Sequence, residues 1–259
     1  QGNFDWTKTE AKLAPKLAKT NKAVIPGFYG SMPNGTIKTF SRGGSDVTGS
    51  IVARATKAKL YENWTDVSGC LICDPRIVNN PEPIKTITYR ELRELAYMGA
   101  TVLHEDAIFP VRAAGIPVNI KNTNQPEDRG TMIVSESAEH CDHIITGIAG
   151  KKGMSVINIE KDKMNSEIGF GKNVLRALEK SNVSFEHMPS GVDTMSVVIA
   201  TEALAGKETA IIDEIKSRVH PDQIYIESNL ALIAVVGRGM KSARGTAAIL
   251  FSALADARV

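Results

Sequence analysis

The spacing of apolar and polar positions predicts that helices and strands alternate through roughly the first half of the chain. A capping-box pattern, Thr7-x-x-Glu10, precedes Leu13 and Leu17 and predicts a helix that runs to about residue 19. The apolar pair Val24-Ile25 predicts a short strand that ends at Pro26-Gly27. Further strands are predicted at residues 36–40, 59–64, 116–121 and 131–134.

Two more helices are predicted among these strands. One begins near Ser45 and buries the face that carries Val47, Ile51, Val52 and Ala55. The other is capped by a second capping box, Thr88-x-x-Glu91, and turns Leu92, Leu95 and Ala96 inward. This alternation is typical of a layered α/β domain, which we expect to extend to about residue 136.

A polar stretch at residues 135–143 marks a boundary, after which the order of elements changes to β-α-β-β-α-β. That order is typical of a ferredoxin-like unit. Strands are predicted at residues 154–160, 183–188, 195–201 and 223–227, and helices at 167–180 and 207–219. A strand at 230–236 and a helix at 241–255 begin a second, incomplete copy. We therefore expect an α/β domain at 1–136, a linker at 137–143, one ferredoxin-like domain at 144–228 and the start of another at 229–259.

Composition narrows the possible partners of a 259-residue chain that is 42% apolar. The 31 basic and 29 acidic residues give a net charge of +2 without a block of like charge, so nucleic acid is not an expected partner. No apolar run approaches the roughly 20 residues that span a bilayer, so we expect no membrane insertion and a cytoplasmic location. Three cysteines are too few for a disulfide framework, and the thiols are expected to be reduced.

The most informative segment is Phe40-Ser-Arg-Gly-Gly-Ser-Asp-Val-Thr48, between a predicted strand and a predicted helix. Gly43 and Gly44 allow backbone N–H groups to approach an anion, and the positive end of the helix dipole points at the same place. Paired glycines here also fit a plain tight turn. The neighbouring Arg42, Ser45 and Asp46 favour a site for a carboxylate or a phosphate.

A second polar segment, Trp64-Thr-Asp-Val-Ser-Gly-Cys-Leu-Ile-Cys-Asp-Pro-Arg76, follows one helix and one strand later. By themselves, Asp66, Asp74 and Arg76 fit a solvated turn closed by Asp-Pro. Together with the glycine loop they favour phosphoryl transfer, which needs positioning and charge neutralisation more than covalent chemistry.

These segments resemble the aspartokinase family (aspartate kinases). The family shows a Gly-Gly-Ser-Asp loop, a Trp-Thr-Asp-Val turn, an Asp-Pro-Arg end and a Gly-Ala-x-Val-Leu-His stretch, which here occupies residues 99–104. Lys121-Asn-Thr123 and Gly130-Thr-Met-Ile133 continue the resemblance, which covers nearly the whole chain. It implies an α/β amino-acid kinase fold, here the C-terminal part of that layered sandwich, followed by ferredoxin-like (α+β) ACT domains.

The resemblance implies transfer of the γ-phosphoryl group of ATP to the side-chain carboxylate of L-aspartate. The product is 4-phospho-L-aspartate, in the first step of lysine, threonine and methionine biosynthesis. By position, Asp46 would orient the catalytic lysine. The substrate aspartate would meet Phe28, Arg42, Gly43, Gly44 and Ser45. The nucleotide, whose phosphates would hold Mg²⁺, would be surrounded by Trp64, Thr65, Asp66, Leu71, Asp74, Arg76 and Thr101.

The chain departs from the family pattern in three places. Many members have lysine at the position of Thr101 and proline at that of Glu105. The family's Lys-Phe-Gly-Gly segment, whose lysine neutralises the transferring group, does not occur here. We therefore expect a piece of a longer enzyme that is inactive alone. The alternatives are a non-catalytic, amino-acid-binding regulatory subunit and a relative that acts on another acid.

A regulatory site is implied by Met164-Asn-Ser-Glu-Ile-Gly-Phe170 and Ser184-Phe-Glu-His-Met-Pro-Ser190, although an ordinary loop and turn fit the same residues. In the family this region binds an end-product amino acid, usually lysine or threonine. The candidate residues by position are Met164, Ser166, Gly169, Ser184, Glu186 and Ser190. Effector binding between ACT units implies a homodimer or a higher homo-oligomer.

Three other patterns are weaker. Gly237-x-Gly239-x-x-Ser242 lacks the third glycine of a dinucleotide fingerprint. Cys70-x-x-Cys73 has redox spacing but no thioredoxin-like context. His140-Cys-Asp-His143 has metal-ligand residue types within a predicted linker, and we expect no metal ligand there.

Overall fold

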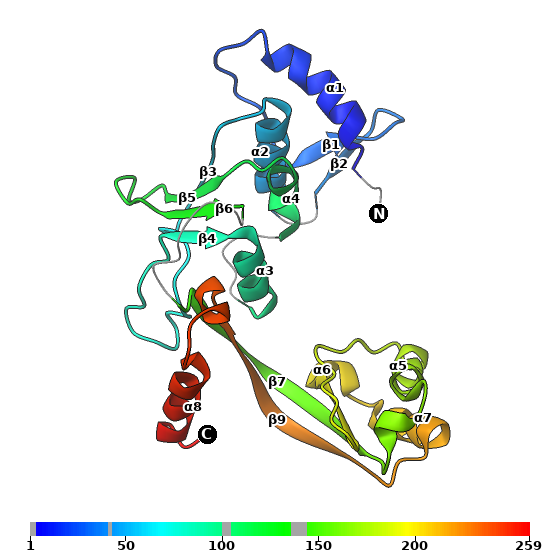
Figure 1. Ribbon diagram of the computed structural model, residues 1–259. Helices are drawn as coiled ribbons and strands as arrows, with labels where there is room; N and C mark the ends of the chain where they lie inside the picture. Colours follow the sequence, from blue (N-terminus) through cyan, green and yellow to red (C-terminus); the bar gives the residue numbers. More distant parts are fainter. Residues whose placement is uncertain (1–3, 41–42, 100–104, 136–143) are drawn as a thin grey trace. The chain divides into compact units, whose positions relative to one another are not determined.

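The computed structural model describes residues 4–40, 43–99, 105–135 and 144–259. These residues form two compact units, one made of Gln1–Ala149 with Ala234–Val259 and the other of Gly150–Ile233 (Figure 1). The two units meet in sequence inside the long strands β7 (Gly147–Glu160) and β9 (Gln223–Val236). The domain limits expected at residues 136, 143 and 228 therefore remain predictions.

The first unit opens with helix α1 (Trp6–Leu17), and its start differs from the predicted one. The N-cap is Asp5, whose carboxylate accepts a 3.0 Å hydrogen bond from the N–H of Lys8. The capping box predicted at Thr7 is wrong, because Asp5 takes the extended N-cap conformation and aspartate is a strong N-cap.

The strand predicted at Val24-Ile25 is also wrong, because Val24 is fully exposed in an irregular segment. The chain instead forms an antiparallel hairpin of β1 (Tyr29–Ser31) and β2 (Ile37–Thr39), which confirms the strand predicted at 36–40.

A four-stranded mixed sheet forms the centre of the first unit, in the order β3-β5-β6-β4. Its strands are β3 (Tyr61–Thr65), β5 (Val118–Asn122), β6 (Thr131–Val134) and β4 (Thr86–Thr88). The β3–β5 and β4–β6 pairs are parallel, and the β5–β6 pair is antiparallel. Parallel pairing of β3 with β5 brings the carboxyl ends of both strands to one edge of the sheet, next to the residues predicted to bind nucleotide.

Helices α2 (Gly44–Ala55), α3 (Tyr89–Tyr97) and α4 (Glu105–Ala113) also belong to this unit. Helix α2 packs against α4, and α3 follows β4 directly. The capping box at Thr88 and Glu91 is present in both directions, as predicted. The core of the unit includes Ile87, Val111, Val118, Ile120 and Ile133, all completely buried.

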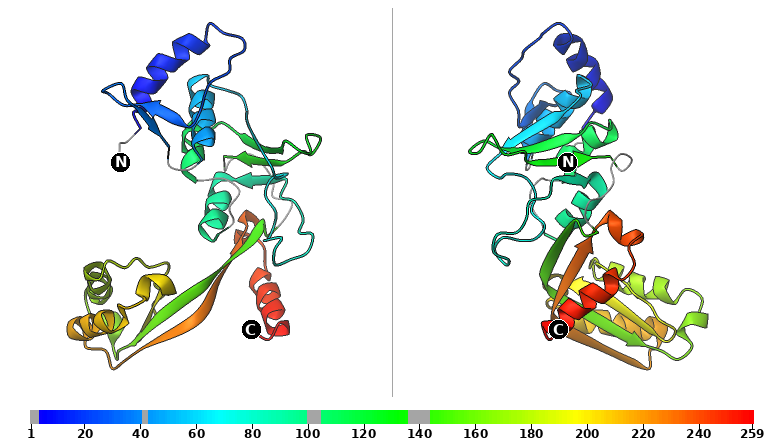
Figure 2. Two further views of the ribbon diagram at one scale, coloured as in Figure 1. Left: turned by 180° about the vertical axis from the view of Figure 1, so that it is seen from behind. Right: turned by 60° about the vertical axis from the view of Figure 1, so that its left-hand side comes forward.

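The second unit has a three-stranded sheet in the order β8-β7-β9, where β8 is Thr194–Ala200. Helices α5 (Phe170–Lys180) and α7 (Glu208–Val219) lie side by side over it, as both views in Figure 2 show. A short 3₁₀ turn, η1 (Met164–Ser166), precedes α5, and a single turn, α6 (Thr201–Leu204), follows β8. The core of this unit is continuous from Ile157 and Ile159 of β7 to residues of both helices.

Two predictions for this unit need correction. Residues 183–188 form no strand and contribute only an isolated bridge, His187 to Val198. The strands predicted at 223–227 and 230–236 are one strand, β9. Asn229, between the two predicted strands, takes a left-handed conformation (φ 62°) without ending the strand. Asparagine tolerates that conformation better than most residues, so β9 can run through this position.

After β9 the chain returns to the first unit through a 3₁₀ turn, η2 (Arg238–Lys241), and a final helix, α8 (Thr246–Asp256). Helix α8 starts later than predicted, after Gly245 in a left-handed conformation. In the described part of the chain, no helix combines the length and the apolar character needed to cross a bilayer.

Candidate active site and regulatory site

The glycine loop leads directly into α2, and the structure shows why both glycines are needed. Gly43 is the N-cap residue, with a left-handed φ of 59° that strains most other residues. A Cβ added to Gly44 would lie 2.7 Å from Cδ2 of Phe28, so only glycine lets this ring pack on the start of the helix. Because Gly43 supplies no side-chain acceptor, the first-turn N–H groups of α2 are left for an anion.

A hydrogen bond from the backbone of Phe28 holds this residue beside the glycine loop. Its N–H donates to Oγ1 of Thr48 at 3.1 Å, and that hydroxyl donates to the carbonyl of Gly44 at 2.8 Å. Phe28 is 46% exposed, so its ring can touch a ligand as well as Gly44. The structure thus brings Phe28, Gly43, Gly44 and Ser45 together, whereas Arg42 lies outside the described residues.

Asp46 lies on the first turn of α2, and β3 holds its side chain. Its Oδ1 accepts a 3.0 Å hydrogen bond from Nδ2 of Asn63, which is buried in the middle of β3. Sequence reasoning missed Asn63, although a polar residue at the inward position of a short strand was a usable signal. Because Asn63 precedes Trp64, β3 connects the glycine loop to the second polar segment.

The second polar segment, Trp64 to Arg76, begins at the carboxyl end of β3. Trp64 is 45% exposed, and the ammonium group of Lys121 lies 5.5 Å from the centre of its ring. The Thr65 hydroxyl donates to the Asp66 carboxylate at 3.1 Å. The Thr65 carbonyl accepts from both the N–H and the hydroxyl of Thr123. An aromatic face, a cation and a carboxylate therefore meet at this edge.

Asp74 and Arg76 form a bidentate pair, with 2.7 Å between Nη2 of Arg76 and Oδ2 of Asp74. The side-chain and backbone donors of Arg76 lower the pKa of Asp74 to about 2, so this carboxylate is ionised at neutral pH. The guanidinium side chain stays 82% exposed. Both residues lie on one irregular loop with Leu71, whereas Thr101 lies outside the described residues.

This loop is tied to the sheet by Thr131 on β6. Its Oγ1 accepts from the N–H of Cys70 at 2.8 Å and donates to the carbonyl of Ile84 at 2.6 Å. Burial raises the pKa of the Cys70 thiol to about 12, so this thiol has little thiolate at neutral pH. The redox reading of Cys70-x-x-Cys73 therefore has no support.

The other weak patterns have structural explanations or lie outside the described residues. A Cβ at Gly237 would be 2.2 Å from the carbonyl oxygen of Ile144, so close packing of two backbones accounts for this glycine. Its neighbour Arg238 donates its N–H to Glu91 at 3.0 Å. The predicted linker residues His140, Cys141 and His143 are not among the described residues.

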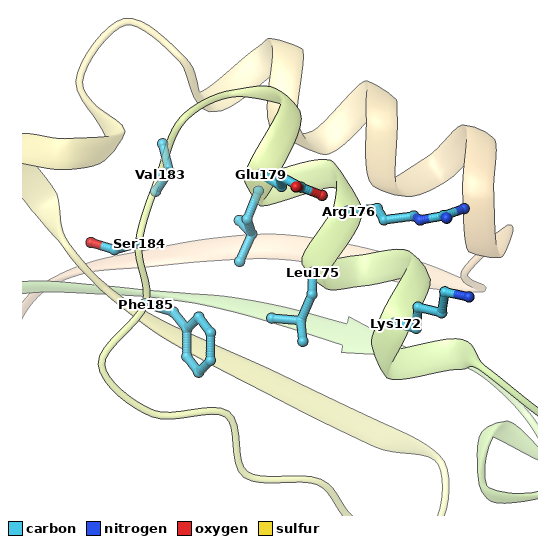
Figure 3. Close-up of a pocket in the computed structure, with 8 residues that line it drawn as sticks. Lys172, Leu175, Arg176, Glu179, Val183, Ser184 and Phe185 are labelled. Carbon is cyan, nitrogen blue, oxygen red and sulfur yellow. The ribbon is translucent and has the colours of Figure 1, made fainter.

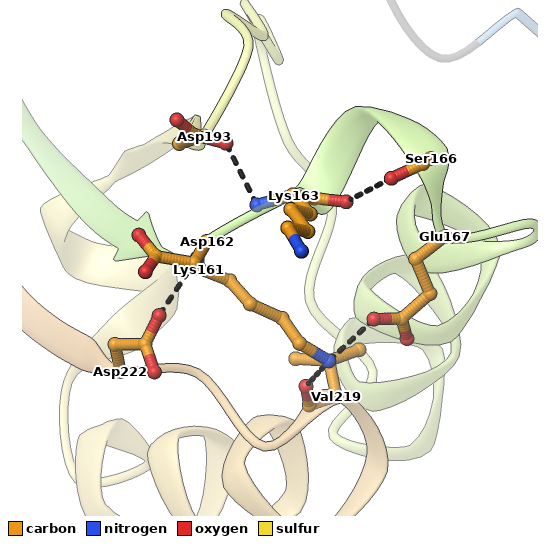
Figure 4. Close-up of polar contacts among 8 residues, drawn as sticks. All are labelled: Lys161, Asp162, Lys163, Ser166, Glu167, Asp193, Val219 and Asp222. Atoms are coloured by element: carbon orange, nitrogen blue, oxygen red, sulfur yellow. Dashed lines mark hydrogen bonds and ion pairs between the residues drawn. The ribbon is translucent and has the colours of Figure 1, made fainter.

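In the second unit, the loop between β7 and α5 carries three of the predicted effector residues. Met164 is buried, Ser166 is exposed, and Gly169 caps α5 with a φ of 85°. Polar contacts brace this loop, as Figure 4 shows: Lys161 binds Glu167 and donates to the carbonyl of Val219 at 2.6 Å. The backbone N–H groups at Asp162 and Lys163 donate to Asp222 and Asp193, respectively.

The other three predicted effector residues lie along the segment beside β8. Ser190 forms a bridge with Met195, near the braced loop, whereas the N–H of Glu186 donates to Val198, further along β8. The carboxylate of Glu186 pairs with the ammonium group of Lys151 at 2.9 Å. Ser184 lines a cavity of about 590 Å³ between this segment and α5 (Figure 3). The six residues therefore do not converge on one point, and their roles stay predictions.

The fold and the glycine loop define the class of protein. Residues 4–122 of the chain match the amino acid kinase family. The chain is homologous, over nearly its whole length, to the aspartokinases of that family, as the sequence motifs predicted.

Three relatives illustrate this homology. Aspartokinase 3 of Bacillus subtilis (strain 168) is 44% identical over 237 residues, covering 91% of this chain and 52% of the relative. The crystal structure of Clostridium acetobutylicum aspartate kinase is 58% identical, with a TM-score of 0.92 over 98% of this chain and 59% of that one. E. coli aspartokinase III in complex with aspartate and ADP is 25% identical, with a TM-score of 0.69 over 96% and 57%. The chain thus spans little more than half the length of these relatives, and the predicted fold is confirmed.

Proposed function

We propose that the complete protein is an aspartate kinase, which transfers the γ-phosphoryl group of ATP to the side-chain carboxylate of L-aspartate and forms 4-phospho-L-aspartate. One observation carries the proposal. The helix start at Gly43 and Gly44, with Phe28 packed on it, is joined through Asn63 of β3 to the edge that carries Trp64. The anion-binding helix start for the acceptor and the aromatic surface for a nucleotide therefore lie on two directly connected elements, α2 and β3. The E. coli relative in complex with aspartate and ADP supports this choice of substrates.

The residues at the glycine loop would bind and orient the acceptor. The first-turn N–H groups of α2 and the exposed hydroxyl of Ser45 can bind a carboxylate of aspartate, and Phe28 can pack on its methylene group. Asp46, an acceptor of one fixed hydrogen bond, would hold a cationic side chain that neutralises the transferring group. We expect that side chain to come from the complete protein.

The residues at the β3 edge would receive the nucleotide as its Mg²⁺ complex, in which the metal ion is part of the substrate. Trp64 and the cation of Lys121 offer a stacking face and a positive charge. Arg76, preoriented by Asp74 but largely exposed, can contact phosphate oxygens with its remaining donors. Such groups act by positioning and by charge neutralisation.

The second unit would bind a regulatory amino acid, lysine or threonine, at the braced loop of residues 161–169 or at the segment of residues 184–190 beside β8. A solved E. coli aspartokinase III contains both lysine and aspartate, which supports an amino-acid effector. We propose further that the complete protein is cytoplasmic and that its ferredoxin-like units associate in a homodimer or a higher homo-oligomer.

The test is aspartate-dependent release of ADP by the complete protein, measured for the wild type and for Asp46→Ala. We expect activity with L-aspartate, much less with L-glutamate, and a fall in kcat of about 100-fold or more in Asp46→Ala. Binding of lysine or threonine, followed by calorimetry, should be nearly unchanged in that variant. Amino-acid binding without any ADP release would instead identify a non-catalytic regulatory subunit.

A further inference from the structure

Asn63 is a polar side chain that is only 8% exposed, and both N–H groups of its amide are used. Its Nδ2 lies 3.0 Å from Oδ1 of Asp46 and 3.0 Å from the hydroxyl oxygen of Tyr61. An ionised carboxylate can only accept hydrogen bonds, so it is the nitrogen of this amide, and not its oxygen, that must face Asp46. The chemistry of the partner thus fixes the orientation of Asn63.

Tyr61 completes a closed set of hydrogen bonds around Asp46. Its hydroxyl accepts from Asn63 and donates to the backbone carbonyl of Asp46 at 3.3 Å. Burial raises the pKa of Tyr61, with the bond from Asn63 opposing this rise and the charge of Asp46 adding to it. The phenol therefore remains a protonated donor at neutral pH. Both the side chain and the carbonyl of Asp46 are then held by β3.

Gly49 makes this arrangement possible from the side of the helix. A Cβ at Gly49 would lie 2.6 Å from the hydroxyl oxygen of Tyr61 and 2.9 Å from two of its ring carbons. The absence of a side chain one turn after Asp46 thus leaves room for the Tyr61 ring against α2. Three residues are therefore complementary: Gly49 on α2, and Tyr61 and Asn63 at alternate positions of β3.

We propose that Asn63 and Tyr61 are positioning residues for Asp46, which fix the carboxylate in the rotamer that presents Oδ2 to a cationic group in the active site. This inference rests on the proposed function, because Asp46 has a partner to orient only in the complete kinase. It adds two residues of β3 to the residues on which turnover depends. Neither is expected to touch a substrate.

Turnover by the complete protein tests the proposal through kcat and KM for two variants and a control. Asn63→Leu keeps the volume of the side chain and removes the donor, and we expect kcat to fall about 10- to 100-fold, with KM for aspartate and ATP changing by less than about 3-fold. Tyr61→Phe removes a single oxygen atom, and a fall of about 3- to 10-fold is expected. The control is Asn158→Leu, which removes a similar bond from an asparagine on β7 to a carboxylate, Glu227, and should leave kcat unchanged.

A double-mutant cycle separates positioning from a purely structural role. If Asn63 acts through Asp46, then Asn63→Leu changes kcat by less than about 2-fold when Asp46 is already alanine. Losses that instead multiply, together with a lowered melting temperature, would mean a structural role and overturn the inference. An unchanged kcat in Asn63→Leu and Tyr61→Phe, with an active wild type, would overturn it while leaving the proposed function intact. A wild type without aspartate-dependent ADP release would overturn both.

Discussion

Glu91 offers the sharpest test of how the first unit is held together. This carboxylate is 4% exposed and accepts four hydrogen bonds from three segments of the first unit. Oε2 accepts from the N–H and the hydroxyl of Thr88, at 3.0 and 2.7 Å. Oε1 accepts from the hydroxyl of Thr146 at 2.7 Å and from the N–H of Arg238 at 3.0 Å. The Arg238 guanidinium forms an ion pair with it at 3.3 Å.

The change Glu91→Gln keeps the shape of the side chain and removes its charge. The amide oxygen of glutamine can still accept two bonds, but its NH₂ group then faces donors that the second carboxylate oxygen had satisfied. Hydrogen bonds to charged groups contribute about 1.5–3 kcal/mol each, and the Thr88 hydroxyl can rotate to accept. We therefore expect the free energy of unfolding of the first unit to fall by about 3 kcal/mol.

The dependence of stability on pH should change as well. Burial acts to raise the pKa of Glu91, but the hydrogen bonds from Thr146, Thr88 and Arg238 outweigh it, so the pKa in the folded state lies below the ordinary 4.5. Above the ordinary pKa of 4.5, the Glu91 carboxylate contributes its full stabilisation. As the pH falls below 4.5, the unfolded state binds a proton first, and the contribution is lost progressively until the pH reaches the lower pKa of the folded state. The stability of Glu91→Gln should not show this decrease at acidic pH.

Urea unfolding of the 259-residue chain, followed by tryptophan fluorescence, isolates the relevant unit because both tryptophans, Trp6 and Trp64, lie in it. The matched control is Glu94→Gln, an exposed glutamate on the same helix, which should change stability by less than about 0.5 kcal/mol. A loss in Glu91→Gln no larger than in the control, or an unchanged pH dependence, would refute this account of the Glu91 contacts.

Three further predictions concern single residues. Gly44→Ala forces the Phe28 ring away from α2, so it should destabilise the first unit by about 1–3 kcal/mol and raise KM for aspartate in the complete protein; an unchanged KM would remove Phe28 from the acceptor site. In the native chain, Cys73 should react with a thiol reagent much faster than Cys70, and equal rates seen by peptide mapping would contradict the burial of Cys70. Glu186→Ala in the complete protein should weaken inhibition by lysine or threonine and leave uninhibited turnover near normal, whereas unchanged inhibition would remove Glu186 from the effector site.

Local signals allowed several elements to be predicted from the sequence. The capping box at Thr88 and Glu91 was found because both partners lie within one turn, and strand 131–134 because Met132, Ile133 and Val134 form a short apolar run. The strand predicted at 183–188 was wrong because its apolar residues are shared between the core and the cavity beside α5, and only His187 bridges to β8.

Contacts between residues far apart in the sequence could not be predicted from local sequence patterns. Glu91 was recognised as a capping residue, but two of its partners, Thr146 and Arg238, lie 55 and 147 residues away. Asn63 likewise meets Asp46 only because β3 runs beside the first turn of α2, 17 residues earlier in sequence. Resemblance to a family located the predicted site residues, whereas the contacts that hold them depend on packing that no short window of sequence shows.

The most direct test of the central proposal is the identity of the product. The complete protein is incubated with MgATP, L-aspartate and hydroxylamine, which converts an acyl phosphate to a stable hydroxamate. The account predicts β-aspartyl hydroxamate in an amount equal to the ADP released, with both products formed at least about 100-fold more slowly when Asp46 is alanine. Release of ADP without the hydroxamate, or hydroxamate formation at an unchanged rate in Asp46→Ala, would contradict it.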